Sequence, residues 1–237
     1  KDVIPHKALY NIKMISKSSG ARVLNISGQM LFQWKYGCDA WHTDYQFNLL
    51  YEYADSPAIR ITSNFTTYEN FDGKSFNYSS QRKRNGDLFK EIRGHAKMAD
   101  DGTGTAEYSL PEDVVFDLPE GTIFPIAHTM ELIEHLNTNK KFFNRVVFDG
   151  SDEEGPVEIN VFIGNQVNAI STMKPNKDID VNLLNAPAWQ VRMAFFPLNN
   201  RQEEADYEMT LQFHDNGIIS DMEVDYDTFS VSQDLVA

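Results

Sequence analysis

Basic residues and long apolar runs are both scarce in this 237-residue chain. Lys and Arg number 21 against 35 Asp and Glu, which gives a formal net charge of −14 at pH 7. Binding to nucleic acid requires basic residues that neutralise phosphates, and electrostatic docking to anionic lipid requires them as well. No apolar run approaches the roughly 18 residues of a membrane-spanning helix. We therefore expect no nucleic-acid partner and no transmembrane segment.

Cysteine occurs once, at Cys38, between two segments with strand-like patterns. A catalytic thiolate needs a helix N-terminus or a basic neighbour that lowers its pKa, and the nearest charged residues, Lys35 and Asp39, give little support for one. In a cytosolic protein a single cysteine is most often an inert thiol, whereas in an exported protein it suggests a partner outside the chain. The sequence leaves both interpretations of Cys38 open, an inert thiol or a disulfide candidate whose partner is absent from this chain.

Familiar catalytic and cofactor motifs are also missing. The sequence has no G-x-S-x-G elbow, phosphate-binding loop, CxxC pair or dinucleotide fingerprint. Acidic residues are too frequent for any two carboxylates to be selected as a catalytic pair. We therefore expect no cofactor and no enzymatic activity.

Two long stretches of alternating polarity dominate the sequence. A period of two places one set of side chains on a buried face and the other in water. Strands usually have about five or six residues, so two strands of more than twice that length are expected to coil, and Gly28 is a natural bend point. The alternation predicts a long, strongly curved antiparallel sheet with an aromatic interior. The inward sets are Leu24, Ile26, Gly28, Met30, Phe32, Trp34 and Tyr36, followed by Trp41, Thr43, Tyr45, Phe47, Leu49, Tyr51 and Tyr53.

Turn signals divide the rest of the chain into further strands. Asp-Gly or Asn-Gly pairs favour type I′ hairpin turns, and they occur at residues 72–73, 85–86, 101–102, 149–150 and 216–217. The segments between turn signals predict about a dozen strands in total. Because no repeat or composition shift marks a boundary, we expect residues 1–237 to form a single domain, mostly β, with a spiral or open-barrel sheet.

One segment breaks the two-residue period. Between Pro125 and Leu136, apolar residues recur at positions 126, 130, 133 and 136, which is helical spacing, and Pro125 suits a first turn. This pattern predicts one amphipathic helix, at about Pro125–Leu136, that covers or plugs the curved sheet.

The aromatic interior has two interpretations that the sequence leaves open. The side chains can form a solid core, or they can line a cavity for an acyl chain or another apolar ligand, because small barrels can enclose ligands. In the second case the candidate lining residues are Trp34, Tyr36, Trp41, Tyr45, Phe47, Met130, Ile133 and Trp189.

The predicted helix also carries His128, Glu131 and His135 on one face. Two His and one carboxylate can bind zinc and leave a position for water. The segment reads E-x-x-E-H, however, and matches neither metalloprotease helix pattern. A solvated polar face is the simpler interpretation, so we assign no metal ligand and no catalytic residue.

Two further motifs stand out. The first reads Leu118-Pro119-Glu120-Gly121-Thr122-Ile123-Phe124-Pro125 and is followed by His128; the second reads Val147-Phe148-Asp149-Gly150-Ser151-Asp152. Together with the stretch from Ser27 through Cys38 to Trp41, they resemble the EipB-like cell-envelope integrity proteins, formerly catalogued as a domain of unknown function. The similarity covers nearly the whole chain. The family motif residues are Pro119, Gly121, Phe124, Pro125, His128, Asp149 and Gly150.

This resemblance implies a periplasmic protein of Gram-negative bacteria whose signal peptide is removed before Lys1. It implies a spiral, open barrel-like sheet, a role in envelope integrity under stress, and no established enzymatic activity. Family members usually pair the cysteine that matches Cys38 with a second one near the C-terminus, which is absent here. Either the native chain extends beyond Ala237 to that cysteine, or this member lacks the bridge.

Three functional hypotheses follow. The leading one is a non-enzymatic periplasmic protein that supports cell-envelope integrity by binding a periplasmic protein partner or an envelope component. The first alternative is a carrier or binder of lipid or lipoprotein in an apolar cavity. The second alternative is a metal-dependent hydrolase that uses His128, Glu131 and His135.

Overall fold

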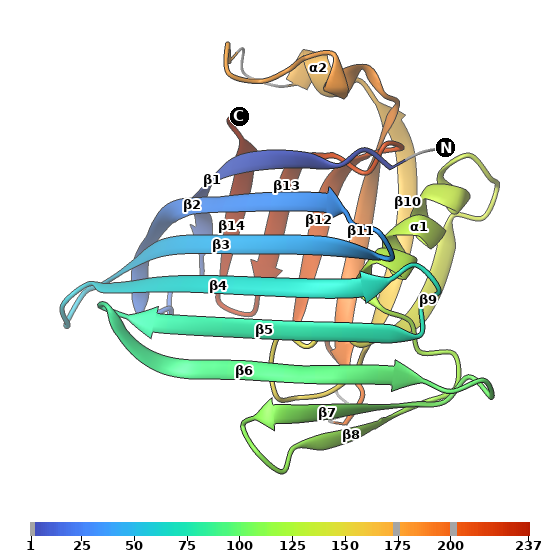
Figure 1. The fold of residues 1–237 in the computed structure, drawn as a ribbon. Helices are drawn as coiled ribbons and strands as arrows, with labels where there is room; N and C mark the ends of the chain where they lie inside the picture. Colours follow the sequence, from blue (N-terminus) through green and yellow to red (C-terminus); the bar gives the residue numbers. More distant parts are fainter. Residues whose placement is uncertain (1–2, 173–175, 200–202) are drawn as a thin grey trace.

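The computed structural model describes residues 3–172, 176–199 and 203–237, and most of them lie in β-strands (Figure 1). The first meander comprises β1 (His6–Lys17), β2 (Val23–Tyr36), β3 (Ala40–Tyr53), β4 (Ile59–Asn70), β5 (Ser75–Arg84), β6 (Asp87–Met98), β7 (Gly104–Leu110) and β8 (Val115–Leu118). Helix α1 (Pro125–Leu136) follows, with the predicted bounds. The second meander comprises β9 (Phe142–Val147), β10 (Val157–Val167), the short helices α2 (Ala169–Thr172) and η1 (Leu183–Asn185), β11 (Ala188–Pro197), β12 (Tyr207–His214), β13 (Ile219–Tyr226) and β14 (Phe229–Leu235).

The fourteen strands formed by the described residues belong to one antiparallel sheet. Its order is β8-β7-β6-β5-β4-β3-β2-β1-β14-β13-β12-β11-β10-β9, so the first and last strands are neighbours in the middle and β8 and β9 are the free edges. Figure 1 shows the sheet folded over on itself: β2–β6 cross in front of β11–β14, and α1 stands at the open side near β9. This is the curved, open sheet that the sequence predicts.

The alternation of buried and exposed side chains along β2 and β3 explains why the sheet curls around an aromatic interior. Trp34 and Trp41 are both buried, and their ring centroids lie 5.1 Å apart, so both point inward. A Cβ at Gly28 would overlap the carbonyl oxygen of Asn48. A glycine is therefore needed where β2 passes this close to the backbone of β3.

Two positions of the predicted inward set are wrong. Leu24 is exposed because the register of β2 and β3 shifts between Val23 and Asn25, which turns Val23 inward in its place. Tyr36, at the end of β2, is 63% exposed and stacks on Phe71, with ring centroids 4.7 Å apart.

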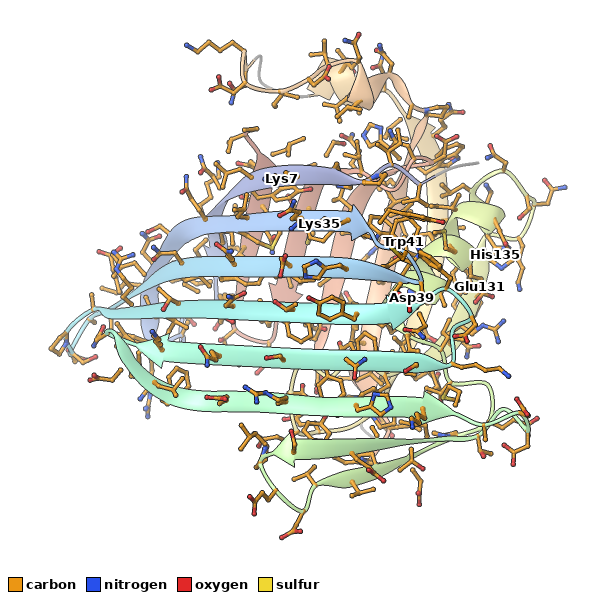
Figure 2. The ribbon with its side chains drawn as sticks, viewed as in Figure 1. Lys7, Lys35, Asp39, Trp41, Glu131 and His135 are labelled. Atoms are coloured by element: carbon orange, nitrogen blue, oxygen red, sulfur yellow. The ribbon has the colours of Figure 1, made fainter. Side chains whose placement is uncertain are left out.

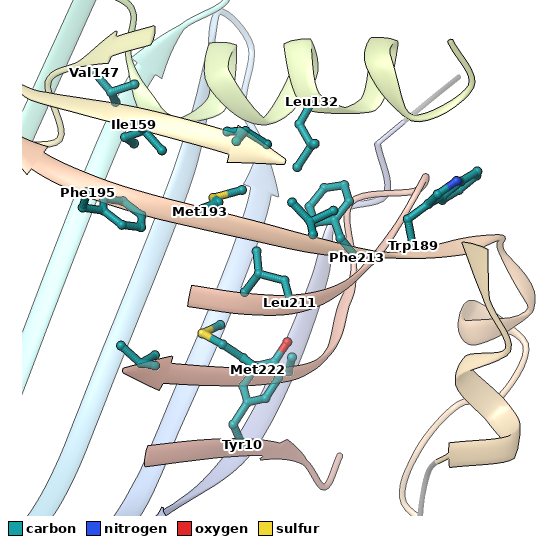
Figure 3. Close-up of a cluster of buried hydrophobic side chains, with 14 of the residues drawn as sticks. Tyr10, Leu132, Val147, Ile159, Trp189, Met193, Phe195, Leu211, Phe213 and Met222 are labelled. Atoms are coloured by element: carbon teal, nitrogen blue, oxygen red, sulfur yellow. The ribbon is translucent and has the colours of Figure 1, made fainter. Parts of the chain in front are cut away.

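Buried apolar side chains form two clusters. The first, which we call the hollow cluster, lies between the two crossing parts of the sheet and α1. Figure 3 shows Leu132 of α1 pointing toward the strands that carry Phe213, Met193 and Leu211. The second, which we call the compact cluster, lies under β5–β8 and consists of Phe76, Tyr78, Ile92, Ala96, Ala106, Tyr108, Leu118, Phe124 and Phe148.

None of the helices in the described parts of the chain is both long enough and apolar enough to cross a bilayer. The longest, α1, has 12 residues, and it packs against the sheet through Ile126, His128, Leu132, Ile133 and Leu136.

Candidate functional site

The hollow cluster encloses a cavity of about 310 Å³ between the sheet and α1. A second cavity of about 310 Å³ lies toward β4 and shares part of this wall, including Trp34, Tyr45 and Pro125. Each volume is at the lower end of the range for small-molecule sites. The first cavity is lined from β1 by His6 and Tyr10, from β2 by Met30, Phe32 and Trp34, from β3 by Tyr45 and Phe47, from α1 by Pro125, His128, Thr129 and Leu132, and from the second meander by Val147, Asp149, Ile159, Met193, Phe195, Met209, Leu211, Phe213, Gly217, Ile219, Met222 and Gln233.

Three of the eight candidate lining residues, namely Trp34, Tyr45 and Phe47, lie in the walls of these cavities. The other five do not belong to either wall. Tyr36, the last residue of β2, is on the surface. Trp41, Ile133 and Trp189 are buried in the hollow cluster itself, and Met130 packs against it half-buried.

The N-terminus of α1 is held by a buried carboxylate that the sequence reasoning missed. Phe124 occupies the N-cap position and offers no side-chain hydrogen bond, and Pro125 has no N–H. The next two backbone N–H groups, of Ile126 and Ala127, donate to Glu69 on β4 at 2.8 and 2.9 Å. Glu69, which lies on a different element of the fold, therefore serves as the capping residue of α1.

Burial governs the ionisation of Glu69. The side chain is only 2% exposed, and this burial raises its pKa to about 7, against the effect of the two backbone hydrogen bonds. A carboxylate facing the positive end of a helix dipole is also favourable. The available signal in the sequence was a charged residue at an inward position of an alternating strand, since Phe65 and Thr67 precede it on the same face.

The opposite side of α1 is attached to the edge strand β9. Arg145 donates to both carboxylate oxygens of Glu131, at 2.7 and 3.0 Å. Burial opposes the ionisation of Glu131, but the hydrogen bonds and charge of Arg145 prevail, and the pKa lies below its ordinary value. The helix is thus attached to two strands, the interior strand β4 and the edge strand β9.

The three residues of the metal hypothesis are not gathered into a metal site. Figure 2 shows Glu131 and His135 on α1, at the same end of the strands as Trp41. Glu131 is paired with Arg145. His135 Nε2 lies 3.6 Å from Oε1 of Glu131, beyond hydrogen-bond distance. His128 is buried against Phe143 and lines the cavity, so the expectation of a solvated face is wrong for this residue. Among the residues that the structure describes, no three His, Cys, Asp or Glu are placed to hold a metal.

The two family motifs lie side by side at this closure. The Ile123 N–H donates to the carbonyl of Val146 at 3.0 Å, and the Phe148 N–H donates to the carbonyl of Ile123 at 3.1 Å. Phe124 stacks on Phe76 in the compact cluster, with ring centroids 4.9 Å apart. Residues 119–125 and 147–152 therefore connect the compact cluster to α1.

The second motif places one carboxylate in the cavity wall. Burial raises the pKa of Asp149, against the hydrogen bond that it accepts from the Ser151 N–H at 2.9 Å. Gly150 has a φ of 65°, and a Cβ there would overlap the ring of Tyr78, so only glycine fits this turn. Of the other motif residues, Gly121 donates its N–H to Gly102, and Pro119 accepts from the hydroxyl of Thr122.

Cys38 is a free, exposed thiol in the turn between β2 and β3. It lies outside the walls of both cavities.

Comparison with known proteins identifies the family. The EipB-like family model matches residues 1–237. The chain belongs to the EipB-like family. It is 26% identical over 238 residues to the cell envelope integrity protein EipB of Brucella abortus (strain 2308), covering 99% of this chain and 83% of that protein.

A solved structure supports the same assignment. It is described as a beta-barrel-like protein of a domain of unknown function from Brucella abortus. The match has a TM-score of 0.88 and 27% identity, and it covers 99% of this chain and 97% of the other. Both the family and the open, curved sheet that the sequence motifs suggested are thereby confirmed.

Proposed function

We propose that this protein supports cell-envelope integrity as a non-enzymatic binding protein of the periplasm, acting on a partner protein or an envelope component. The envelope role is supported by the relative whose name states it. The single structural observation that supports binding is the cavity behind α1. Two carboxylates at α1 favour binding over catalysis, because Glu69 and Glu131 are engaged in holding the helix.

A second candidate is a carrier of lipid or lipoprotein, in which the curled sheet and α1 enclose an acyl chain. The apolar wall of the cavity, contributed by both meanders, favours it. The attachment of α1 also favours it. The helix is a separate element that packs against the sheet through one buried face and is held at β4 and β9 by polar contacts, so an occupant can enter when α1 moves away from the sheet.

Complementation in the host tests the envelope role and the cavity together. Deletion of the gene is expected to increase sensitivity to detergents and envelope-directed antibiotics, and wild-type protein is expected to restore resistance. Met209→Trp fills the cavity from a half-buried position, whereas Met14→Trp makes the same change at a half-buried position outside the wall. We expect Met14→Trp to complement and Met209→Trp to fail, with both variants folded by circular dichroism.

The outcomes separate the two parts of the proposal. An unchanged sensitivity of the deletion strain would contradict the envelope role. Full complementation by Met209→Trp would show that the function does not require the cavity. Native mass spectrometry of protein purified from its host tests the carrier candidate: a co-purifying lipid supports it, and a mass equal to that of the bare chain contradicts it.

A further inference from the structure

In the part of the chain that the structure describes, the wall of the cavity contains three buried polar atoms without a hydrogen-bond partner. They are Nε1 of Trp34 on β2, Nε2 of His128 on α1 and Oε1 of Gln233 on β14. The three residues are 4%, 5% and 8% exposed, respectively. Buried polar atoms are nearly always hydrogen-bonded, and an unsatisfied one costs about 1–3 kcal/mol. Three such atoms from three elements around one space indicate that the space receives a polar partner.

The donor and acceptor character of these atoms restricts that partner. The indole Nε1 of Trp34 only donates, and Oε1 of Gln233 only accepts. Burial lowers the pKa of His128 to about 4, so its ring is neutral at neutral pH and Nε2 donates or accepts according to the tautomer. The partner must therefore both accept and donate hydrogen bonds. Hydroxyl and amide groups do both, whereas a carboxylate only accepts.

The charges around the cavity restrict the partner further. Among the residues that the structure describes, no Lys or Arg lines the cavity, and the acidic residue in its wall is Asp149. A buried carboxylate or phosphate would have no counter-charge here and would face Asp149, which is unfavourable in a low-dielectric interior. A cationic headgroup offers only donors and would leave the Trp34 N–H unsatisfied. Both considerations favour an uncharged headgroup.

We propose that the cavity binds an uncharged amphiphile: an apolar body that fills the space between the sheet and α1, with hydroxyl or amide groups that hydrogen-bond to Trp34 and Gln233. This inference rests on the carrier candidate above and specifies its ligand class. Lipids with a free carboxylate or phosphate inside the cavity are disfavoured, whereas monoacylglycerols and fatty alcohols fit.

Binding of two matched ligands to the full chain tests the inference. Monolauroylglycerol and laurate share the same twelve-carbon chain and differ in the headgroup, and both are measured below their critical micelle concentrations at pH 7.5 by native mass spectrometry. We expect the uncharged ligand to bind at least tenfold more tightly. Trp34→Phe removes the N–H and keeps an aromatic ring, and the loss of one hydrogen bond predicts about five- to tenfold weaker binding of monolauroylglycerol.

Trp189→Phe is the matched control. Trp189 is equally buried but does not line either cavity, so its replacement is expected to leave the affinity unchanged. Gln233→Leu, which removes the acceptor, is expected to weaken binding as Trp34→Phe does. Thermal melts establish that each variant is folded.

Each outcome decides the inference. Equal or tighter binding of laurate overturns the uncharged-headgroup assignment and leaves the carrier candidate standing. Binding of neither ligand, as expected of a cavity that holds water only, overturns the inference outright. An affinity for monolauroylglycerol that Trp34→Phe and Gln233→Leu leave unchanged overturns the roles of these residues. The complementation result for Met209→Trp depends on none of these measurements, so failure of the proposed function is recognised separately.

Discussion

The compact cluster and the hollow cluster are built from the same kinds of residues but differ in how completely they are filled. In the compact cluster Phe76, Phe124 and Phe148 have no exposed surface. Its tyrosine hydroxyls have partners, since Tyr108 donates to the carbonyl of Asp152 at 2.6 Å and Tyr78 to that of Glu107 at 3.4 Å. The hollow cluster instead contains a cavity and three unsatisfied polar atoms.

This difference indicates a division of labour within one sheet. Complete packing and satisfied polar groups fix a single arrangement, which suits a region that positions the two family motifs and the start of α1. Incomplete packing with unpaired polar atoms lowers the stability of the fold. Such a cavity suits a region whose space receives an occupant. The comparison predicts that equivalent mutations in the two clusters lower the free energy of unfolding by different amounts.

A matched pair of truncations gives the largest expected effect. Leu118→Ala in the compact cluster removes contacts on all sides of the side chain, and we expect a loss of about 4 kcal/mol in the free energy of unfolding. Leu211→Ala in the wall of the cavity removes fewer contacts because one side of the leucine already faces empty space. Its expected cost is about 2 kcal/mol. Urea denaturation measures the free energy of unfolding of both variants, and equal losses would contradict the distinction between the clusters.

The closure of the hollow cluster has an expected pH dependence. Because burial raises the pKa of Glu69 from an ordinary value of 4.5 to about 7, the folded protein retains a proton that the unfolded chain has lost between these two values. Stability therefore falls as the pH rises through this window, by up to about 3 kcal/mol. Glu69→Gln removes the titration and keeps an acceptor for the helix N–H groups.

The measurement is the difference in unfolding free energy between wild type and Glu69→Gln at pH 4.5, 6.0 and 7.5. Titration of Asp149, whose pKa burial also raises, is present in both proteins and cancels in the difference. A difference that stays constant, or that moves in favour of wild type as the pH rises, would show that the helix N–H groups outweigh burial at Glu69.

The smallest effect is expected at the other attachment of α1. Arg145 is about half exposed in its ion pair with Glu131, and such pairs contribute about 1 kcal/mol or less. Arg145→Ala is therefore expected to lower the free energy of unfolding by no more than about 1 kcal/mol, with a smaller change in high salt. A loss as large as that of Leu118→Ala would show that the Arg145 contact, and not Glu69, is the main attachment of the helix.

The fold was largely predictable from the sequence because its signals are local. The alternation of β2 and β3 and the helical spacing of Pro125–Leu136 each arise within one element, and the structure has both. Leu24 was misplaced because a register shift depends on the partner strand, which alternation alone does not reveal.

The site was less predictable because it depends on contacts between distant elements. Glu69 caps a helix that begins 56 positions later in the sequence. Its inward position on an alternating strand indicates burial, but nothing in the local sequence indicates which helix it contacts. His128 has the spacing of a solvated metal face, yet it is buried in the cavity wall against Phe143 of β9, which is a contact between two elements. The aromatic character of the lining was predictable, whereas the division between cavity wall and solid core was not.

The pairing of β1 with β14 in the middle of the sheet has a consequence for folding. Tyr10 pairs with Leu235 and Lys17 with Phe229, so the two meanders join only when the last of the described strands is available. Until then β1 has an unpaired backbone edge of the kind that recruits other chains, and such long-range pairing is slow. A partly synthesised chain therefore exposes the edge of β1 until β14 is made, and the yield of native protein depends on how well β1 is protected from other chains during that interval.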